Sequence, residues 1–243
     1  MKKIKILLIL ILLSFSNTAL STEYRISINT NIRSHGFLPK EWKSQYGSDL
    51  KISSIHKHEL PKIRKVIHTF KKSYPSELLK RTLKSVHLVG KYRLKNMVFS
   101  GTYFDNIIVL KSAGDNYTHK YLVRILHHEY SSILMEYRYF PKREWLAVSG
   151  KYGVYGSDKY FLINSSNARD EKAKFFKKGF LTYYGTTSFT EDVNTYAEFF
   201  FMTKKRLIRI GNKHPRVRKK TEIMTKFYCG LHKEMKRYMN CDT

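Results

Sequence analysis

The chain contains few cysteines and none of the common signatures of metal-finger or nucleic-acid-binding proteins. Its 243 residues include two cysteines, Cys229 and Cys241, whose spacing fits no metal-binding motif. In an oxidising compartment these thiols could close a short loop and pin the last helix; two free thiols are the alternative. No internal repeat, zinc-finger spacing, Gly-rich phosphate loop or aromatic RNA-binding signature is present. The sequence therefore argues against those modules.

Acidic residues are also scarce. The chain has 46 Lys and Arg residues against 19 Asp and Glu, a formal net charge of +27. Such a charge attracts anionic lipid head groups, cell-wall polymers or nucleic acid. The basic residues are spread along the whole chain, with local concentrations at Lys71-Lys72, Lys204-Lys205-Arg206 and Arg216–Lys220. Because dispersed charge is typical of a solvated surface, we do not expect nucleic acid to be the partner.

Long apolar runs are missing after the N-terminus, which itself has the organisation of a signal peptide. Three lysines precede the short apolar run Ile6–Leu13, and Ala19-Leu20-Ser21 offers small residues at the positions that a signal peptidase reads. We expect cleavage after Ser21 and a secreted or periplasmic chain; an uncleaved N-terminal anchor is the alternative. Removing residues 1–21 leaves 222 residues with 43 basic and 19 acidic side chains, a net charge of +24. No later segment is apolar enough to cross a membrane.

Hydrophobic periodicity predicts an α+β fold, because helices, strands and more helices follow one another without regular alternation. The predicted elements are a strand at Tyr24–Asn29, helices at Leu60–Phe70 and from Pro75, strands at Val86–Leu94 and Asn106–Leu110, and helices at Thr118–Arg138, Ser188–Lys204 and Lys220–Met239. Between them we expect an irregular segment at Ser34–Asp49, a turn at Ser100-Gly101, a long loop or insertion at 140–178 and a basic linker containing Pro215. The resulting division is 1–21 signal peptide, 22–54 N-terminal extension, 55–205 main domain, and 206–243 linker and C-terminal helix.

The predicted helix in the middle of the chain carries the sequence most informative about function, His127-His128-Glu129-Tyr130-Ser131-Ser132. Zinc proteases of the HExxH type place two histidines four residues apart on one helical face, and the glutamate after the first activates the metal-bound water. Here His128 and Glu129 stand in that order, but Ser132 takes the place of the second histidine. A serine hydroxyl is a poor zinc ligand at neutral pH. His127 cannot substitute, because neighbouring helical residues point about 100° apart.

A second polar helix is predicted downstream. Glu191, Asn194 and Glu198 fall on one face of it, together with Thr195, and the opposite face is apolar. Gluzincin zinc proteases take a glutamate ligand from such a helix, and a second acidic group one turn away commonly orients a ligand histidine. The alternative is a simple capping role, because Glu191-Asp192 also suits a helix N-terminus.

The order of these segments resembles exported bacterial zinc-binding metallopeptidases of the gluzincin kind. The shared pattern is a Gly-turn and strand, the His-His-Glu-aromatic helix, Gly-Phe-Leu-Thr-Tyr-Tyr, and the helix with Glu-Asp and Tyr-Ala-Glu-Phe-Phe. The last helix is also similar to that of the anthrax lethal factor catalytic domain. The resemblance covers about residues 55–205. It implies a zincin fold, with a small mixed sheet over the motif helix and a mostly helical second half.

Carried onto this sequence, the resemblance implies zinc as cofactor and a peptide or protein as substrate. His128 would be a zinc ligand, Glu129 the general base, and either Glu191 or Glu198 the third ligand. The chain departs from the family pattern at Ser132 and in the spacing of the two acids. The leading hypothesis is therefore an exported metallopeptidase-like protein that is weakly active or degenerate. The rival is a non-catalytic basic protein that holds an anionic polymer of the periplasm or cell surface; a structural protein without a ligand has no sequence feature of its own.

Overall fold

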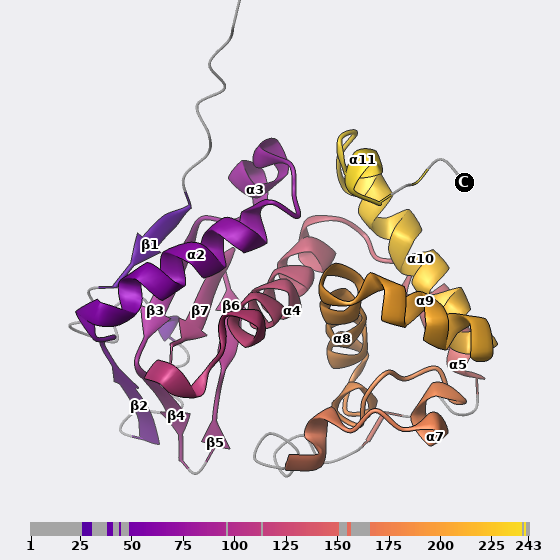
Figure 1. Ribbon diagram of the computed structural model, residues 1–243, viewed down its shortest axis with the longest axis horizontal. Coiled ribbons are helices and arrows are strands. Elements are labelled where there is room, and N and C mark those ends of the chain that lie inside the picture. Colours follow the sequence, from indigo (N-terminus) through magenta and orange to yellow (C-terminus); the bar gives the residue numbers. More distant parts are fainter. Residues whose placement is uncertain are drawn as a thin grey trace, which may run out of the picture.

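The computed structural model describes residues 26–30, 38–40, 44, 49–95, 97–112, 114–150, 155–156, 166–239 and 241. Figure 1 shows a half that contains the strands and the helices α2 to α4, and a second half of helices α5 to α11. Helices α4 and α8 lie side by side where the halves meet. The candidate site therefore depends on these two helices.

The strands form two small sheets. The larger has the order β1-β3-β7-β6, in which β1 (Ser27–Asn29), β3 (Ser85–Val89) and β7 (Ile107–Lys111) are parallel and β6 (Gly101–Phe104) pairs antiparallel with β7. The smaller is antiparallel and consists of β2 (Leu50–Ser53), β4 (Lys91–Leu94) and β5 (Met97–Val98). Strand β6 is an edge strand of the larger sheet, and its residues line one wall of the cleft described below.

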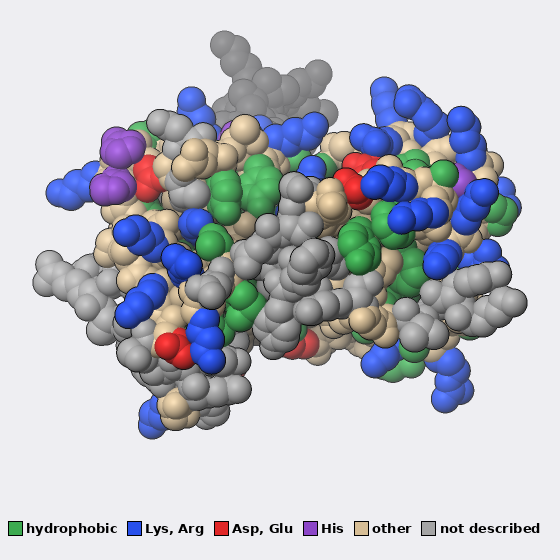
Figure 2. Space-filling view, turned by 90° about the horizontal axis from the view of Figure 1, so that it is seen from below, with side chains coloured by type: hydrophobic (Ala, Val, Ile, Leu, Met, Phe, Trp, Pro, Cys, Tyr) green, Lys and Arg blue, Asp and Glu red, His purple; other side chains and the backbone are tan. Residues whose placement is uncertain are grey.

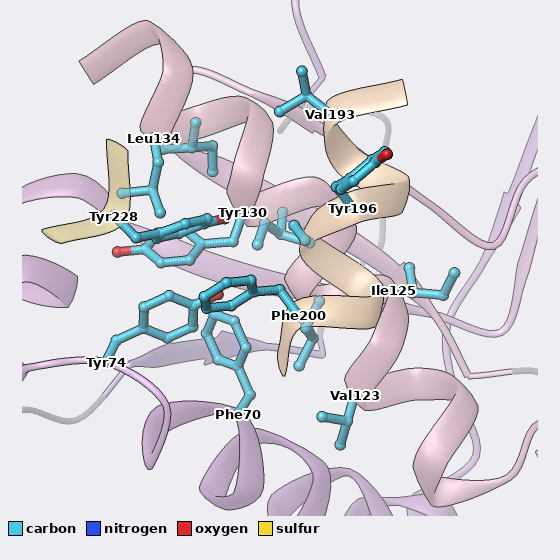
Figure 3. Close-up of a cluster of buried hydrophobic side chains, with 14 of the residues drawn as sticks. Phe70, Tyr74, Val123, Ile125, Tyr130, Leu134, Val193, Tyr196, Phe200 and Tyr228 are labelled. Carbon is cyan, nitrogen blue, oxygen red and sulfur yellow. The ribbon is translucent and has the colours of Figure 1, made fainter. Parts of the chain in front are cut away.

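Helix α4 (His119–Tyr137) is the central element of the first half. It begins where the Thr118 side chain accepts a hydrogen bond from the backbone N–H of Tyr121, a standard N-cap. It packs against α2 (Leu60–Lys71), α3 (Ser76–Thr82), β6 and β7. In Figure 3 the aromatic rings of α2 and the turn after it meet rings of α4, α8 and α10 in one buried cluster. This cluster joins the two halves through their core.

Strand β6 approaches α4 closely at Gly101. A β-carbon at this position would lie 2.6 Å from Cγ2 of Ile125 and 3.1 Å from Oε1 of Glu129. Neither distance leaves room for a side chain, so the glycine permits the contact between strand and helix. The carboxylate of Glu129 consequently lies against the edge strand.

The second half is helical. Its elements are α5 (Lys142–Ser149), α7 (Ala173–Phe176), α8 (Phe189–Met202), α9 (Lys204–Lys213), α10 (Pro215–Leu231) and α11 (Met235–Met239). Helix α8 begins at Ser188, whose hydroxyl accepts from the backbone N–H of Glu191. A disulfide between Cys229 and Cys241 ties α10 to the segment after α11. Of the two possibilities for these cysteines, the bridge is the one found.

The α+β class and the main helices are confirmed. The predicted helices at Leu60–Phe70 and from Pro75 correspond to α2 and α3, and those at Thr118–Arg138 and Ser188–Lys204 correspond to α4 and α8. The strand at Asn106–Leu110 corresponds to β7 with a shift of one residue. Val86–Leu94 is two strands, because the chain breaks between β3 and β4 at Gly90. These agreements follow from strong periodicity in each segment.

Several predictions about the connecting segments were wrong. The predicted basic linker is helix α9 with the first turns of α10, and α10 begins at Pro215, where proline suits the first turn. Residues 140–178 contain α5 and α7 rather than one long loop. At the predicted turn Ser100-Gly101, Ser100 is a bend and Gly101 already begins β6. The strand β2 was not predicted. Most of Ser34–Asp49 lies outside the described residues.

No helix in the described part of the chain combines the length and the apolar character needed to cross a bilayer. The predicted signal peptide, residues 1–21, lies outside the described residues.

Candidate functional site

A cleft of about 510 Å³ lies between the two halves. Its walls come from strand β6 and the residues before it, from α4, from α8, and from the segments around positions 168–169 and 182–190. The residues that the sequence nominated all line it: His128, Glu129, Ser132, Glu191, Asn194, Thr195 and Glu198. The two polar helical faces therefore converge on one space, as predicted.

His128 is held between two carboxylates. Its Nδ1 lies 2.8 Å from Oε1 of Glu198, and its Nε2 lies 2.8 Å from Oε2 of Glu191. Burial by itself would lower the pKa of His128, but the hydrogen bonds to Glu191 and Glu198 outweigh it and raise the pKa to about 10. The imidazole is therefore a cation at neutral pH, donating one N–H to each glutamate.

Glu198 also binds two arginines. Nη1 of Arg169 donates to its Oε2 at 3.0 Å, and Nε of Arg124 lies 3.5 Å from the same oxygen. Burial opposes ionisation of this carboxyl, but Arg169 and His128 hold its pKa below the ordinary value. One oxygen of Glu198 thus faces His128 and the other faces the arginines, so both oxygens already have partners within the protein.

Ser132 is hydrogen-bonded to helix α8. Nδ2 of Asn194 donates to its Oγ at 2.7 Å. Nearby, the hydroxyl of Tyr103 on β6 donates to Oε1 of Glu136 on α4 at 2.9 Å. These bonds link α8, α4 and the edge strand across one end of the cleft. The hydroxyl that replaces a ligand histidine therefore already has a partner within the protein.

Tyr184 lies on the opposite wall of the cleft, with its ring 6.1 Å from that of His128. Burial raises its pKa well above the ordinary value, and the charges of Glu191 and Glu129 raise it further. The Tyr184 hydroxyl therefore stays protonated in a region of negative potential. The potential is notable because the chain as a whole is strongly basic.

The donor set does not match a zinc site with three protein ligands. Among the described residues, no group of three or more His, Cys, Asp or Glu side chains is arranged to hold a metal ion. Tetrahedral zinc, with bonds of about 2.0 Å, would separate two donor atoms by about 3.3 Å. Nε2 of His128 and Oε2 of Glu191 are 2.8 Å apart, the distance of a hydrogen bond. The residues present thus offer two charged or basic donors and one neutral hydroxyl.

The start of α8 is fixed by a buried ion pair behind the cleft. Nζ of Lys220 lies 2.6 Å from Oδ2 of Asp192, and both side chains are fully buried. Trp145 and Tyr155 donate to the same oxygen at 2.8 and 2.9 Å. Burial raises the pKa of Asp192 and lowers that of Lys220, and their mutual attraction opposes both shifts. This pair anchors the turn of α8 that carries Glu191.

The sequence did not identify several residues of the site. Arg169 contacts Glu198 directly and Tyr103 lines the same cleft, yet neither belongs to a motif. Asp192 was assigned only a capping role, whereas its partner Lys220 lies on α10, 28 positions later. The local signal for Asp192 was its position as an acid in the first turn of α8, on a side of the helix that is otherwise apolar.

Comparison with solved structures identifies a similar fold. The chain superimposes on the crystal structure of a putative zinc-binding metallo-peptidase from Bacteroides caccae with a TM-score of 0.52 and 16% sequence identity. The match covers 90% of this chain and 81% of the other. The likeness confirms the zincin-like α+β fold. No protein-family model and no curated protein sequence matches the chain.

Proposed function

We propose that the protein is a degenerate relative of the zinc metallopeptidases: it binds peptide segments in its cleft, and its affinity for zinc is weak. The similar fold of a zinc-binding metallo-peptidase supports the general kind of protein. The observation that carries the degeneracy is the hydrogen bond from Asn194 to Ser132 at 2.7 Å. It places a neutral, already partnered hydroxyl where a second imidazole would be needed.

The geometry also favours separate roles for the two glutamates. Nδ1 of His128 donates to Glu198, which is the contact that orients a metal-binding histidine in many zinc sites. Nε2 faces Glu191 instead. We therefore assign the residual metal-binding donors to His128 and Glu191, and the orienting role to Glu198.

Zinc titration calorimetry tests the proposal with a matched pair of variants. Ser132→His supplies the missing imidazole from a position that already faces the cleft, so it should bind zinc at least tenfold more tightly than the native protein. Ser132→Ala removes the same hydroxyl without adding a ligand, so it should remain as weak as the native protein. Tight stoichiometric zinc binding by the native chain would refute the degeneracy. Equal affinity of all three proteins would show that the cleft is not a remnant zinc site.

Peptide binding is tested separately. A blocked alanine pentapeptide should bind the metal-free protein, and calorimetry or chemical-shift perturbation should place it at cleft residues. Release of cleavage products should be slow or absent without added zinc, and should increase in Ser132→His with zinc. Failure of every peptide to bind would overturn the proposed function.

Export is part of the same proposal. The Lys-rich start, short apolar run and Ala19-Leu20-Ser21 support cleavage, and the Cys229–Cys241 disulfide suits an oxidising compartment. Intact-mass measurement of secreted or periplasmic material should give a chain that begins at Thr22. A mass that includes Met1 would favour an uncleaved anchor.

A second candidate function is binding of an anionic polymer. The observation that favours it is the surface of α9, where Lys205, Arg206, Arg209 and Lys213 are all exposed. Figure 2 likewise shows Lys and Arg side chains over both halves of the visible face and few acidic ones. Retention on heparin that weakens steeply with salt, and that falls when Lys205 and Arg209 are changed to Gln, would support it. Weak retention at low salt would remove it.

A further inference from the structure

The hydrogen bond at Ser132 sets the orientation of the Asn194 amide. Nδ2 of Asn194 donates to Oγ of Ser132 at 2.7 Å. Only the NH₂ end of an asparagine amide can donate, so this end faces Ser132. The carbonyl oxygen is therefore the end of the amide that does not meet Ser132.

This orientation leaves the Asn194 carbonyl oxygen without a hydrogen bond. The side chain is only 2% exposed, and its Oδ1 has no hydrogen-bond partner among the residues that the structure describes. Asn194 lines the cleft, between residues of α4 and the neighbouring turns of α8. Buried acceptors of this kind are rarely left unsatisfied in native proteins, because the loss of hydration costs free energy. An oxygen in the wall of a cleft can be satisfied by a ligand that carries an N–H or O–H group.

The surroundings of Asn194 select among such ligands. Glu191 precedes it by one turn of α8, Glu198 follows it by one turn, and Glu129 lines the same cleft. Glu198 is balanced by His128 and the arginines. The cleft is lined by three carboxylates, Glu129, Glu191 and Glu198, and by two cationic side chains, His128 and Arg169, so negative charge is in excess along its walls. A cationic donor is therefore favoured over a neutral one, and an anionic group is disfavoured.

We propose that the cleft binds a cationic nitrogen group of a peptide, either an ammonium or a guanidinium group, with Asn194 Oδ1 as a direct hydrogen-bond acceptor. Asn194 is then a specificity-determining residue. The inference rests on the proposed peptide-binding function and names the chemical class that the cleft prefers. Two sources share this chemistry, the free N-terminus of a peptide and a Lys or Arg side chain.

Titration with synthetic pentapeptides separates the two sources. The probes are blocked pentaalanine, the same peptide with a free N-terminus, and blocked peptides with a central Lys, Arg or Glu. A cationic probe should bind about tenfold more tightly than blocked pentaalanine, the size expected for a charge-assisted hydrogen bond. The Glu peptide should bind most weakly. Because the protein carries a net charge of +27, general electrostatics would give the opposite order.

Variants assign the preference to Asn194. In Asn194→Leu the tenfold preference should fall below about twofold, since a tenfold change corresponds to loss of one such contact. Asn212→Leu, at an exposed asparagine of α9, is the matched control and should keep the native preference. If Asn194→Leu does not fold, Asn194→Asp provides the test. It keeps an acceptor of equal size and adds a charge, so it should bind the cationic probe at least threefold more tightly than the native protein does.

The outcomes separate this inference from the proposed function. Native binding of all five peptides with equal affinity would overturn the cationic preference and leave peptide binding standing. A preference retained in a folded Asn194→Leu variant, or unchanged in Asn194→Asp, would overturn the role of Asn194. A preference for the Glu peptide would overturn the assigned chemistry. Binding of none of the peptides would defeat both proposals.

Discussion

His127 and His128 are neighbours in the sequence, yet they lie in opposite environments on the two sides of α4. His127 is 1% exposed and faces the aromatic cluster between α2 and α8, where its ring stacks on Phe201 with centroids 4.6 Å apart. His128 faces the cleft and lies between Glu191 and Glu198. Both side chains are buried, so exposure alone does not distinguish them.

Their protonation differs because their partners differ. Burial lowers the pKa of His127 to about 3, and the charge of Glu198 opposes this only weakly. In the described part of the chain its hydrogen-bond partner is the hydroxyl of Tyr74, 2.9 Å from Nδ1. His128 is equally deprived of water, but two carboxylates raise its pKa to about 10. Rotation by about 100° around one helix thus separates a neutral core residue from a buried cation.

The largest effect should come from removing the cation. His128→Leu leaves Glu191 and Glu198 facing each other without the charge between them, and breaking a buried ion pair by removing one partner costs about 3–5 kcal/mol. Urea unfolding at pH 7 measures the loss. The control is Glu191→Gln combined with His128→Leu, which removes one of the stranded charges and should recover part of the stability. A loss below about 1 kcal/mol would mean that the His128 bridge is absent in solution.

The second effect is the dependence of stability on alkaline pH. Because the folded-state pKa of His128 lies above the unfolded value of 6.5, its contribution is complete below pH 6.5 and is lost as pH rises to about 10. The native protein should therefore lose up to about 1.4 kcal/mol per pH unit over this window, relative to His128→Leu. Unfolding measured at pH 7, 8 and 9 checks the slope. Parallel curves for the two proteins would contradict the raised pKa.

The sequence predicted the features that depend on local periodicity, and it did not predict those that depend on partners far away in the chain. Periodicity on α4 and α8 was sufficient to place His128, Ser132, Glu191 and Glu198 in one cleft, because each helix buries its apolar stripe. At its last residue, Tyr137, helix α4 leaves the core, and the side chain is 46% exposed. The choice between Glu191 and Glu198 could not be made from spacing.

Contacts between distant segments could not be predicted from one sequence. Arg169 ends a short 3₁₀ helix, Ser166–Arg169, and nothing near it in the chain indicates that its guanidinium reaches Glu198. Lys220 looked like one of many basic surface residues, whereas it is fully buried among Trp145, Phe180 and Tyr196 rings. The basic character of 204–219 also concealed α9, because its apolar positions are few and separated by lysines and arginines.

The third effect appears on the acidic side and belongs to His127. Its folded-state pKa of about 3 lies below the unfolded value of 6.5, so the unfolded chain binds the proton first and stability falls as pH drops below 6.5. His127→Phe keeps a planar ring in the aromatic cluster and cannot titrate. Between pH 6.5 and 5 the native protein should lose about 2 kcal/mol more than this variant does. Equal acid sensitivity of the two proteins would place His127 outside the core.

The smallest effect concerns the hydrogen bond between His127 and Tyr74. Tyr74→Phe keeps the ring, which packs against Phe70 and Tyr130 in the cluster of Figure 3, and removes the hydroxyl that meets Nδ1 of His127. A buried imidazole nitrogen without a partner should cost about 1 kcal/mol of unfolding free energy at pH 7. In the His127→Phe background there is no nitrogen to leave unpaired, so the same substitution should cost less than about half as much. The double-mutant cycle, measured by urea unfolding, gives the coupling directly. Zero coupling would mean that the two rings only pack, and that the hydrogen bond between Tyr74 and His127 adds nothing to stability.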